Sequence, residues 1–409
     1  MDKVFLKRYA ELAVKTGVNI QKGQKLFINS PIECADFTRL VADMAYDNGA
    51  KDVIINWIDE KFSKIRFMKA PKEVFEEMPD WQKEFYLSNV KDGAAFLSIH
   101  ASDPELLKDV DPNIISIAQK TRSIALKEYS ERLMSNKNAW SVISIPTEGW
   151  ATKVFPELSP KDAMKKLWDY IFNIVRVDKE NPVEAWKEHT NNLKNKMNAL
   201  NSYHFKSMHY KNSLGTDLTV ELPKKHLWLG GSEHTENGIE FLANMPTEEI
   251  FSLPLKTGVN GTLVSSKPLN YGGNLINNFS FTFKDGKIVD FKAEQGYESL
   301  KHLIETDEGS HYLGEIALVP FHSPISNSNI IFFNTLYDEN ASCHFAIGKA
   351  YSVCIENGAN MDEDQLKENG VNDSLTHVDF MVGTNDLSII GTTYDGKEIE
   401  VFKNGDWAI

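Results

Sequence analysis

The chain has 409 residues, more than one hydrophobic core usually accommodates, so we expect two domains. Its 58 acidic and 44 basic residues give a formal net charge of −14 without a long basic cluster, which argues against nucleic acid as a partner. No run of about 18 apolar residues occurs, so no membrane-spanning segment is expected.

The cysteines indicate a reducing compartment. Cys34, Cys343 and Cys354 are odd in number and form no CxxC motif, so a disulfide framework is not expected. The first residues follow the pattern of an amphipathic helix broken by charges, which differs from the pattern of a signal peptide. We therefore expect a cytoplasmic protein.

The first half of the chain alternates between helix and strand patterns. Ser102, in a Ser-Asp-Pro-Glu segment, is expected to cap a helix. Short apolar runs typical of buried strands occur at residues 26–28, 53–57, 94–99 and 141–145. Buried strands separated by helices predict an α/β domain, a parallel sheet with flanking helices, over residues 1–190. Its last part, from residue 156, is expected to be helical and to bridge to a second domain.

The second half changes to a hydrophobic period of two, which is typical of antiparallel strands. Phe279, Phe281 and Phe283 alternate with polar residues up to Asp285-Gly286, a two-residue hairpin signal. Similar turns recur at residues 395–396 and 404–405. These patterns predict an α+β domain rich in antiparallel strands over residues 191–409, and we place the metal-binding catalytic site there.

The distribution of histidines favours this second domain as the site of chemistry. Ten of the eleven histidines lie at or after His189, and acidic residues accompany them between Glu249 and Asp379. Carboxylates and imidazoles without paired thiolates suit a hydrolytic site with one or two divalent metal ions. Chance clustering of a rare residue is the alternative.

His377 and Asp379 lie two positions apart in residues 376–383, which have strand character. On a strand they would point to the same face, where both could reach one metal ion or two ions that share a bridging carboxylate. The exposed polar face of an edge strand is the alternative.

Two further acidic positions are candidates. Glu315 opens an apolar segment, where burial requires a partner charge or a metal ion, although a solvated strand end would also explain it. Glu248 and Glu249 are adjacent and point to opposite sides of an extended segment. At most one of them is therefore a ligand, and the other is expected to be exposed.

Residues 338–348 are expected to form a short helix that ends at Gly348. It would carry His344, either as a ligand or as a buried structural histidine. It would also carry Glu339, as a ligand, as a base or as an acid that favours the helix N-terminus. Tyr351 would lie on the same face only if the helix continued past Gly348.

Other kinds of site lack their motifs. HExxH, GxSxG, GxGxxG and GxxxxGK[ST] are absent, so a zinc-protease helix, a serine nucleophile and a nucleotide cofactor have no support. His302 and Glu305 have HxxE spacing, but we interpret them as a charged pair on a helix surface.

Several stretches, specific only as a set, carry a family resemblance: residues 244–251, 306–310, 313–315, 337–348 and 377–383. With them, essentially the whole chain resembles the aminopeptidase T family of metallopeptidases, also called the aminopeptidase S family. Members are thermophilic-type metalloproteases with a co-catalytic two-metal site, and they form homodimers around an internal active-site cavity.

The resemblance also implies the residues of the site. Glu315 would bridge the metal ions, Tyr351 would be the active-site tyrosine, and Glu339 would occupy another acidic position near them. The complete set of implied metal ligands is Glu249, Glu315, His344, His377 and Asp379. Two divalent ions per subunit are implied, zinc or cobalt first, with manganese or magnesium as further options.

The resulting hypothesis is a metal-dependent aminopeptidase that removes N-terminal residues from peptides through a metal-activated water. Glu339 or Glu249 would transfer the proton, and Tyr351 would donate a hydrogen bond to the developing oxyanion. One alternative is another metal-dependent hydrolase, acting on an amide or a phosphoester. A second is a non-enzymatic two-domain protein that binds a small ligand.

Overall fold

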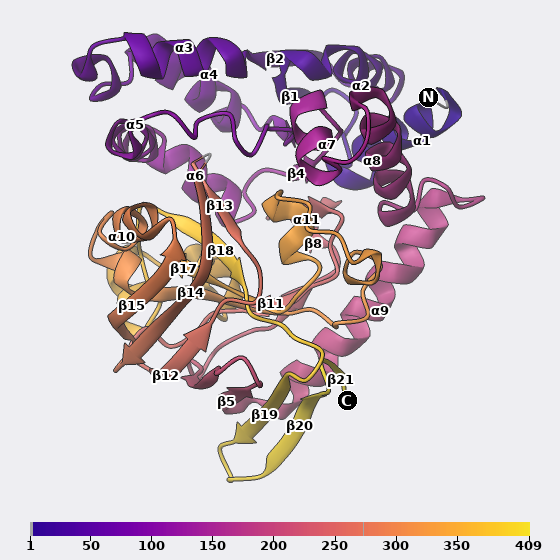
Figure 1. The fold of residues 1–409 in the computed structure, drawn as a ribbon. Coiled ribbons are helices and arrows are strands. Elements are labelled where there is room, and N and C mark those ends of the chain that lie inside the picture. The colour runs from indigo at the N-terminus through magenta and orange to yellow at the C-terminus, as the bar shows by residue number, and fades with distance from the viewer. Residues whose placement is uncertain (1–2, 273) are drawn as a thin grey trace. The chain divides into compact units, whose positions relative to one another are not determined.

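The computed structural model describes residues 3–272 and 274–409, which divide into two compact units (Figure 1). Unit 1 contains the described residues up to Thr190 together with Ser232–Thr247 and Phe332–Leu336. Unit 2 contains Asn191–Gly231, Glu248–Ile331 and Tyr337–Ile409. We propose that the boundary between the two domains lies between residues 190 and 191.

Short apolar strands build the sheet of unit 1: β1 (Lys25–Pro31), β2 (Asp52–Ile58), β3 (Ala95–Ile99), β4 (Trp140–Ile143) and β10 (Asn244–Met245). They run in the order β10-β4-β3-β1-β2, and every neighbouring pair is parallel. The predicted parallel sheet is therefore confirmed. A separate antiparallel pair is formed by β8 (Glu233–His234) and β9 (Glu240–Phe241).

Helices alternate with these strands along the chain, as predicted. Their bounds are α1 (Lys3–Leu12), α2 (Ala35–Asp47), α3 (Glu60–Lys69), α4 (Asp80–Lys91), α5 (Pro112–Ala125), α6 (Lys127–Met134), α7 (Glu148–Val154), α8 (Pro160–Ile174) and α9 (Pro182–Tyr203). The last of them, α9, continues into unit 2.

The helix expected to start at Ser102 is absent, which corrects the prediction. Residues 104–109 form turns, and the next helix, α5, begins only at Pro112. The Ser102 hydroxyl donates to the Glu60 carboxylate and does not cap backbone N–H groups. Asp111 supplies the cap instead, because its Oδ1 accepts from Asn113 N at 2.9 Å and a proline at the first helical position favours the start.

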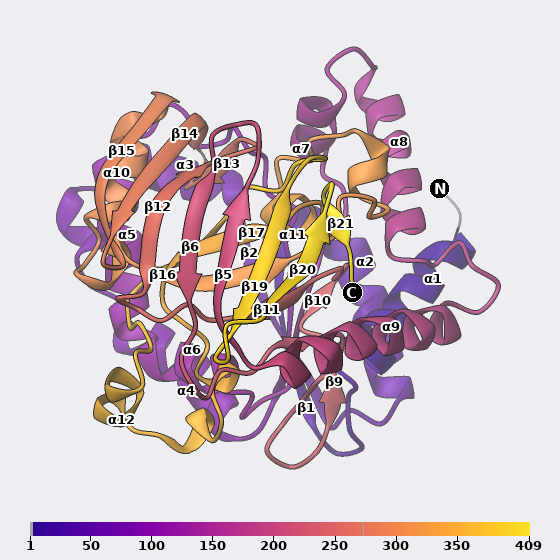
Figure 2. The same ribbon diagram turned by 90° about the horizontal axis from the view of Figure 1, so that it is seen from below.

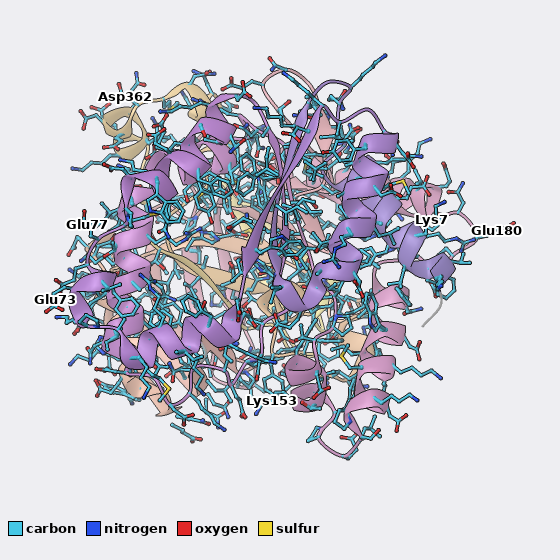
Figure 3. The ribbon with its side chains drawn as sticks, turned by 90° about the horizontal axis from the view of Figure 1, so that it is seen from above. Lys7, Glu73, Glu77, Lys153, Glu180 and Asp362 are labelled. Carbon is cyan, nitrogen blue, oxygen red and sulfur yellow. The ribbon has the colours of Figure 1, made fainter. Side chains whose placement is uncertain are left out.

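Aromatic side chains fill the core beside β1 and β3. The ring of Phe27 lies 5.2 Å from that of Phe96 and 5.5 Å from that of Tyr86, and all three are buried. Charged side chains lie outside, as the exposed Lys7 and Glu73 do in Figure 3. The acidic residues of unit 1 are thus mainly a solvated surface.

Antiparallel strands form a long sheet in unit 2: β5 (Phe205–Lys211), β6 (Asp217–Glu221), β12 (Val259–Val264), β13 (Leu269–Tyr271), β14 (Asn274–Lys284), β15 (Lys287–Gln295), β19 (Ser388–Thr393), β20 (Glu398–Lys403) and β21 (Asp406–Trp407). Figure 2 shows β15, β14, β12, β6, β5, β19 and β20 side by side in this order. A second sheet contains β7 (Leu229–Gly230), β11 (Ile250–Ser252), β16 (Leu313–Leu318), β17 (His344–Gly348) and β18 (His377–Met381). Its order is β18-β17-β16-β11-β7, again antiparallel.

Short helices complete unit 2 and confirm its predicted α+β class: α10 (Tyr297–Ile304), α12 (Glu363–Glu368) and the end of α11 (Thr335–Glu339), which begins in unit 1. The hairpin predicted at Asp285-Gly286 joins β14 to β15. Both turn residues have positive φ angles, 49° and 82°, as a tight turn compatible with strand twist requires.

The two sheets of unit 2 share one core. Phe281 of the long sheet packs against Phe380 of the second sheet, with ring centroids 5.1 Å apart, and Phe345 lies 6.4 Å from Phe380. All three side chains are at most 1 % exposed. The second sheet therefore has one face fixed by aromatic packing, which leaves its other face for chemistry. No helix in the described parts of the chain is long and apolar enough to cross a membrane.

The core of unit 2 leads to a stability prediction. Phe281→Ala removes a fully buried ring, so we expect it to lower the free energy of unfolding by about 3–5 kcal/mol. Chemical denaturation followed by fluorescence measures this change. Val289→Ala, at a side chain that is 58 % exposed, is the control and should change the free energy by less than about 0.5 kcal/mol. Equal effects of the two variants would contradict the assignment of this core.

Candidate metal centre

The register of β16, β17 and β18 brings the candidate ligands onto one face. Glu315 is paired with Ala346, and Ala346 is paired with Asp379, so the two carboxylates flank a small residue in one cross-strand row. His377 is opposite Gly348 in the next row. Directly opposite residues lie on the same face of a sheet. Small residues between ligands leave space on this face.

The prediction of a helix over residues 338–348 is wrong. The helix α11 ends at Glu339, and His344 is the first residue of strand β17. Every residue of β17 is buried between two neighbouring strands, so sheet pairing overrides the local helix signals. The strand nevertheless delivers His344 to the site.

The ligand atoms form a connected set. His344 Nε2 lies 3.1 Å from Glu249 Oε2 and 3.9 Å from Glu315 Oε1. His377 Nε2 lies 3.2 Å from Glu315 Oε2 and 3.5 Å from Asp379 Oδ1. Among the described residues, these side chains make two groups able to hold a cation, and both groups contain Glu315.

Backbone carbonyls orient both imidazoles. His344 Nδ1 lies 3.0 Å from the carbonyl oxygen of Glu339 and 3.1 Å from that of Ser342. His377 Nδ1 lies 2.6 Å from the carbonyl oxygen of Lys349. A carbonyl only accepts, so each Nδ1 carries the proton and donates it, and each Nε2 faces the carboxylates. This is the arrangement in which histidine binds a metal ion through Nε2.

Burial and charge fit the site to divalent cations. Burial alone would lower the pKa of His344, but the Glu249 carboxylate raises it to about 10. Burial raises the pKa of Glu315 to about 7, although His377 opposes this rise. Asp379 Oδ1 is buried and accepts no hydrogen bond of ordinary geometry from the described residues. Protons must therefore compensate the carboxylates when no cation does, and a metal ion can replace them.

Glu339 lies beside the ligand groups without belonging to either of them. Its side chain is 8 % exposed. Burial, reinforced by the charges of Asp379 and Glu249, raises the pKa of Glu339 well above its ordinary value. A carboxyl group that favours its protonated form next to a metal centre is suited to proton transfer.

Tyr351 contacts the site through its ring. Its centroid lies 4.9 Å from that of His377 in an edge-on arrangement and 5.7 Å from that of Phe251. The residue precedes a short 3-10 turn and follows β17, so no helix places it there. No helix continues past Gly348, and the ring of Tyr351 nevertheless contacts that of His377, a candidate ligand.

The acidic pair differs from expectation in one respect. Glu249 joins His344 and Glu315, but Glu248 is also buried, at 5 % exposure, where we expected an exposed residue. The backbone is anchored at this point, because Glu248 N donates to Asn340 Oδ1 at 2.7 Å just before β11. The sequence did not predict three groups that support the site: the carbonyls of Ser342 and Lys349, which orient the imidazoles, and the side chain of Asn340. The one local signal of a strand here was the alternation in His344-Phe-Ala-Ile-Gly.

The cross-strand row predicts the effect of filling the space between two ligands. Ala346→Leu places a larger side chain between Glu315 and Asp379, so the metal content should fall. Overpacking should also lower the free energy of unfolding by about 1–3 kcal/mol. Elemental analysis of purified protein measures the metal content. Ile347→Leu, on the opposite face of the same strand, is the control and should bind metal as the wild type does. Wild-type metal content in Ala346→Leu would contradict the arrangement.

Comparisons with known proteins identify the family and the fold. Residues 3–407 match the family described as Thermophilic metalloprotease (M29). Aminopeptidase 2 of Geobacillus stearothermophilus is 52 % identical over 98 % of this chain and 97 % of its own. Aminopeptidase AmpS of Bacillus subtilis is 51 % identical over 98 % of both. The structure of wild-type AmpT from Thermus thermophilus, 37 % identical, superposes with a TM-score of 0.91 over the whole of both chains. The chain therefore belongs to the thermophilic metalloprotease family.

Proposed function

We propose that this chain is a metal-dependent aminopeptidase that removes N-terminal residues from peptides by means of a metal-activated water. The observation that carries the proposal is the pair of ligand groups that share Glu315. Membership of a metalloprotease family, with aminopeptidases among relatives that match almost end to end, supports the reaction class.

We further propose two divalent ions per subunit. Glu249, Glu315 and His344 would hold one ion, and Glu315, His377 and Asp379 would hold the other. With neutral imidazoles and with Glu339 ionised in the metal-bound site, four carboxylates would be present, and two divalent ions would balance their formal charge. Mixed nitrogen and oxygen ligands suit zinc or cobalt, with manganese or magnesium as further options. Bound ions would lower the pKa of a water molecule and polarise the peptide carbonyl.

Glu339 is the proposed general base. Its buried carboxyl group belongs to neither ligand group, so it is available to take a proton from the attacking water. It would then donate this proton to the nitrogen of the departing peptide, which leaves as an amine. Glu249 is the alternative base, but its close contact with His344 favours a role as ligand.

Tyr351 is the proposed hydrogen-bond donor to the carbonyl oxygen. Its ring contact with His377 supports a position at the edge of the metal centre. A hydroxyl placed there would stabilise the negative charge that develops on this oxygen during attack. One metal ion, or a carboxylate of the same cluster, would bind the free α-amino group and restrict cleavage to the first residue of a peptide.

Two properties of the whole protein complete the proposal. Cys34, Cys343 and Cys354 are free, buried thiols, which supports a cytoplasmic location with reducing conditions. A homodimer is proposed from the family resemblance alone, and sedimentation of the purified protein tests it.

The function predicts a pattern of substrates and inhibitors. Aminoacyl p-nitroanilides should be hydrolysed, whereas their N-acetylated counterparts should not, because acetylation removes the charged amine. Activity should disappear with chelator and return with zinc or cobalt. The measurement uses protein of counted metal content, with p-nitrophenyl phosphate as a further substrate. Cleavage of the phosphoester alone would replace the proposal with another metal-dependent hydrolase, and metal-independent binding without turnover would favour a ligand-binding protein.

The role of Glu339 predicts a loss of rate without a loss of metal. Glu339→Gln should lower kcat by about 100- to 10,000-fold, since a general base contributes about this much, while metal content stays at the wild-type level. Glu315→Gln is the matched comparison and should lower both, because Glu315 belongs to both ligand groups. Steady-state kinetics and elemental analysis give the two readouts. Reduced metal content in Glu339→Gln would instead make Glu339 a ligand.

A further inference from the structure

Asp307 joins two segments that lead into the metal centre. Its Oδ1 accepts from Ser310 N and from the Ser374 hydroxyl, both at 2.8 Å, and its Oδ2 accepts from Leu375 N at 2.6 Å. The turn at residues 306–310 precedes β16, which carries Glu315. The segment with Ser374 and Leu375 precedes β18. One half-buried carboxylate thus links the starts of both strands.

The network continues from this link to the imidazole of His377. Lys349 N donates to the carbonyl oxygen of Thr376, the residue after Leu375, at 2.7 Å. The carbonyl oxygen of Lys349 in turn accepts from His377 Nδ1 at 2.6 Å. The segment held by Asp307 is therefore joined through Thr376 to Lys349, whose carbonyl oxygen orients the His377 ring.

A second side chain closes the same junction. Asn372 Nδ2 donates to the carbonyl oxygens of Gly309 at 2.8 Å and of Gly348 at 2.6 Å. The segments approach so closely that a Cβ on Gly309 would lie 1.9 Å from the carbonyl oxygen of Asp373. This close packing leaves little freedom for the segment before β18 to move relative to β16.

The junction matters because Glu315 and His377 come from strands that are not neighbours. Strand β17 lies between β16 and β18, and the pairing of β16 with β17 is irregular between Leu313 and Glu315. Sheet pairing therefore does not by itself fix the 3.2 Å separation of Glu315 Oε2 and His377 Nε2. Asp307 bridges the two segments directly, outside the sheet.

We propose that Asp307 is a positioning residue for the group formed by Glu315, His377 and Asp379, and that it sets the affinity of this group for a divalent cation. The inference rests on the proposed function, because it concerns the same metal centre. His344 is held at the other end of β17 by the carbonyls of Glu339 and Ser342. Asp307 therefore acts on one ligand group more than on the other.

The test is titration of chelator-treated protein with Co²⁺, followed by calorimetry and by the visible absorption of bound Co²⁺. Asp307→Asn keeps the volume of the side chain but places an amide N–H against Leu375 N, so one hydrogen bond is lost. Asp379→Asn identifies which binding phase belongs to its group. In Asp307→Asn we expect this phase to weaken by about 10- to 100-fold, as for other residues that orient metal ligands, with the other phase unchanged.

Two further variants separate positioning from general destabilisation. Ser374→Ala removes one donor to Asp307 and should weaken the same phase by a smaller factor. Glu308→Gln is the matched control, because this exposed neighbour forms an ion pair with Lys287, and it should bind Co²⁺ as the wild type does.

Three results for the Co²⁺ titration would overturn the role of Asp307. A wild-type isotherm in Asp307→Asn, or a lower thermal midpoint of the metal-free protein with unchanged Co²⁺ affinity, would overturn it and assign Asp307 a purely structural role. Equal weakening of both phases would also overturn it. Wild-type protein that takes up no Co²⁺ would overturn the proposed function together with this inference.

Discussion

The candidate metal centre depends on buried negative charge. Glu249, Glu315 and Glu339 are all less than 9 % exposed, and Asp379 lies beside them. An isolated carboxylate in a protein interior is strongly unfavourable, so the cluster is stable only with protons or cations between its members. Burial works to lower the pKa of His377, yet Asp379 and Glu315 raise it well above its ordinary value. These carboxylate charges retain protons in the metal-free chain. When divalent cations are available, the same charges favour binding of the cations over binding of protons.

The second sheet of unit 2 makes this concentration of charge possible. The face away from the site is fixed by the packing of Phe380 with Phe345 and with the β14 rings of Phe279 and Phe281, which opposes separation of the strands by charge repulsion. On the site face, Ala346 and Gly348 occupy the positions opposite ligands and leave room that larger side chains would fill. Rigidity on one face and space on the other are both needed, because ligands must be held close without touching.

Much of this arrangement could be predicted from local sequence, and the failures share one cause. The period of two identified β14, since a strand with one buried face shows this alternation directly. The strand character of residues 376–383 identified β18, which carries His377 and Asp379. The helix predicted over residues 338–348 was wrong because capping signals are local, whereas the strand β17 forms through pairing with residues far along the chain. The burial of Glu248 and the links made by Asp307 also arise from contacts with distant segments. The spacing of residues along the sequence does not predict such contacts.

The proposed mechanism constrains which acids can serve the substrate. Metal-activated water hydrolyses amides and phosphoesters alike, so preference for an N-terminal residue must come from a group that binds the α-ammonium. Glu339 cannot be both the proton carrier and the partner of the ammonium, because a carboxylate that takes up a proton loses the charge the ammonium requires. The two tasks therefore belong to different acids. Glu248 and Asp338, both buried and both adjacent in sequence to residues of the site, are acids that the proton transfer does not use. A site of this kind needs more buried carboxylates than its metal ions alone would require.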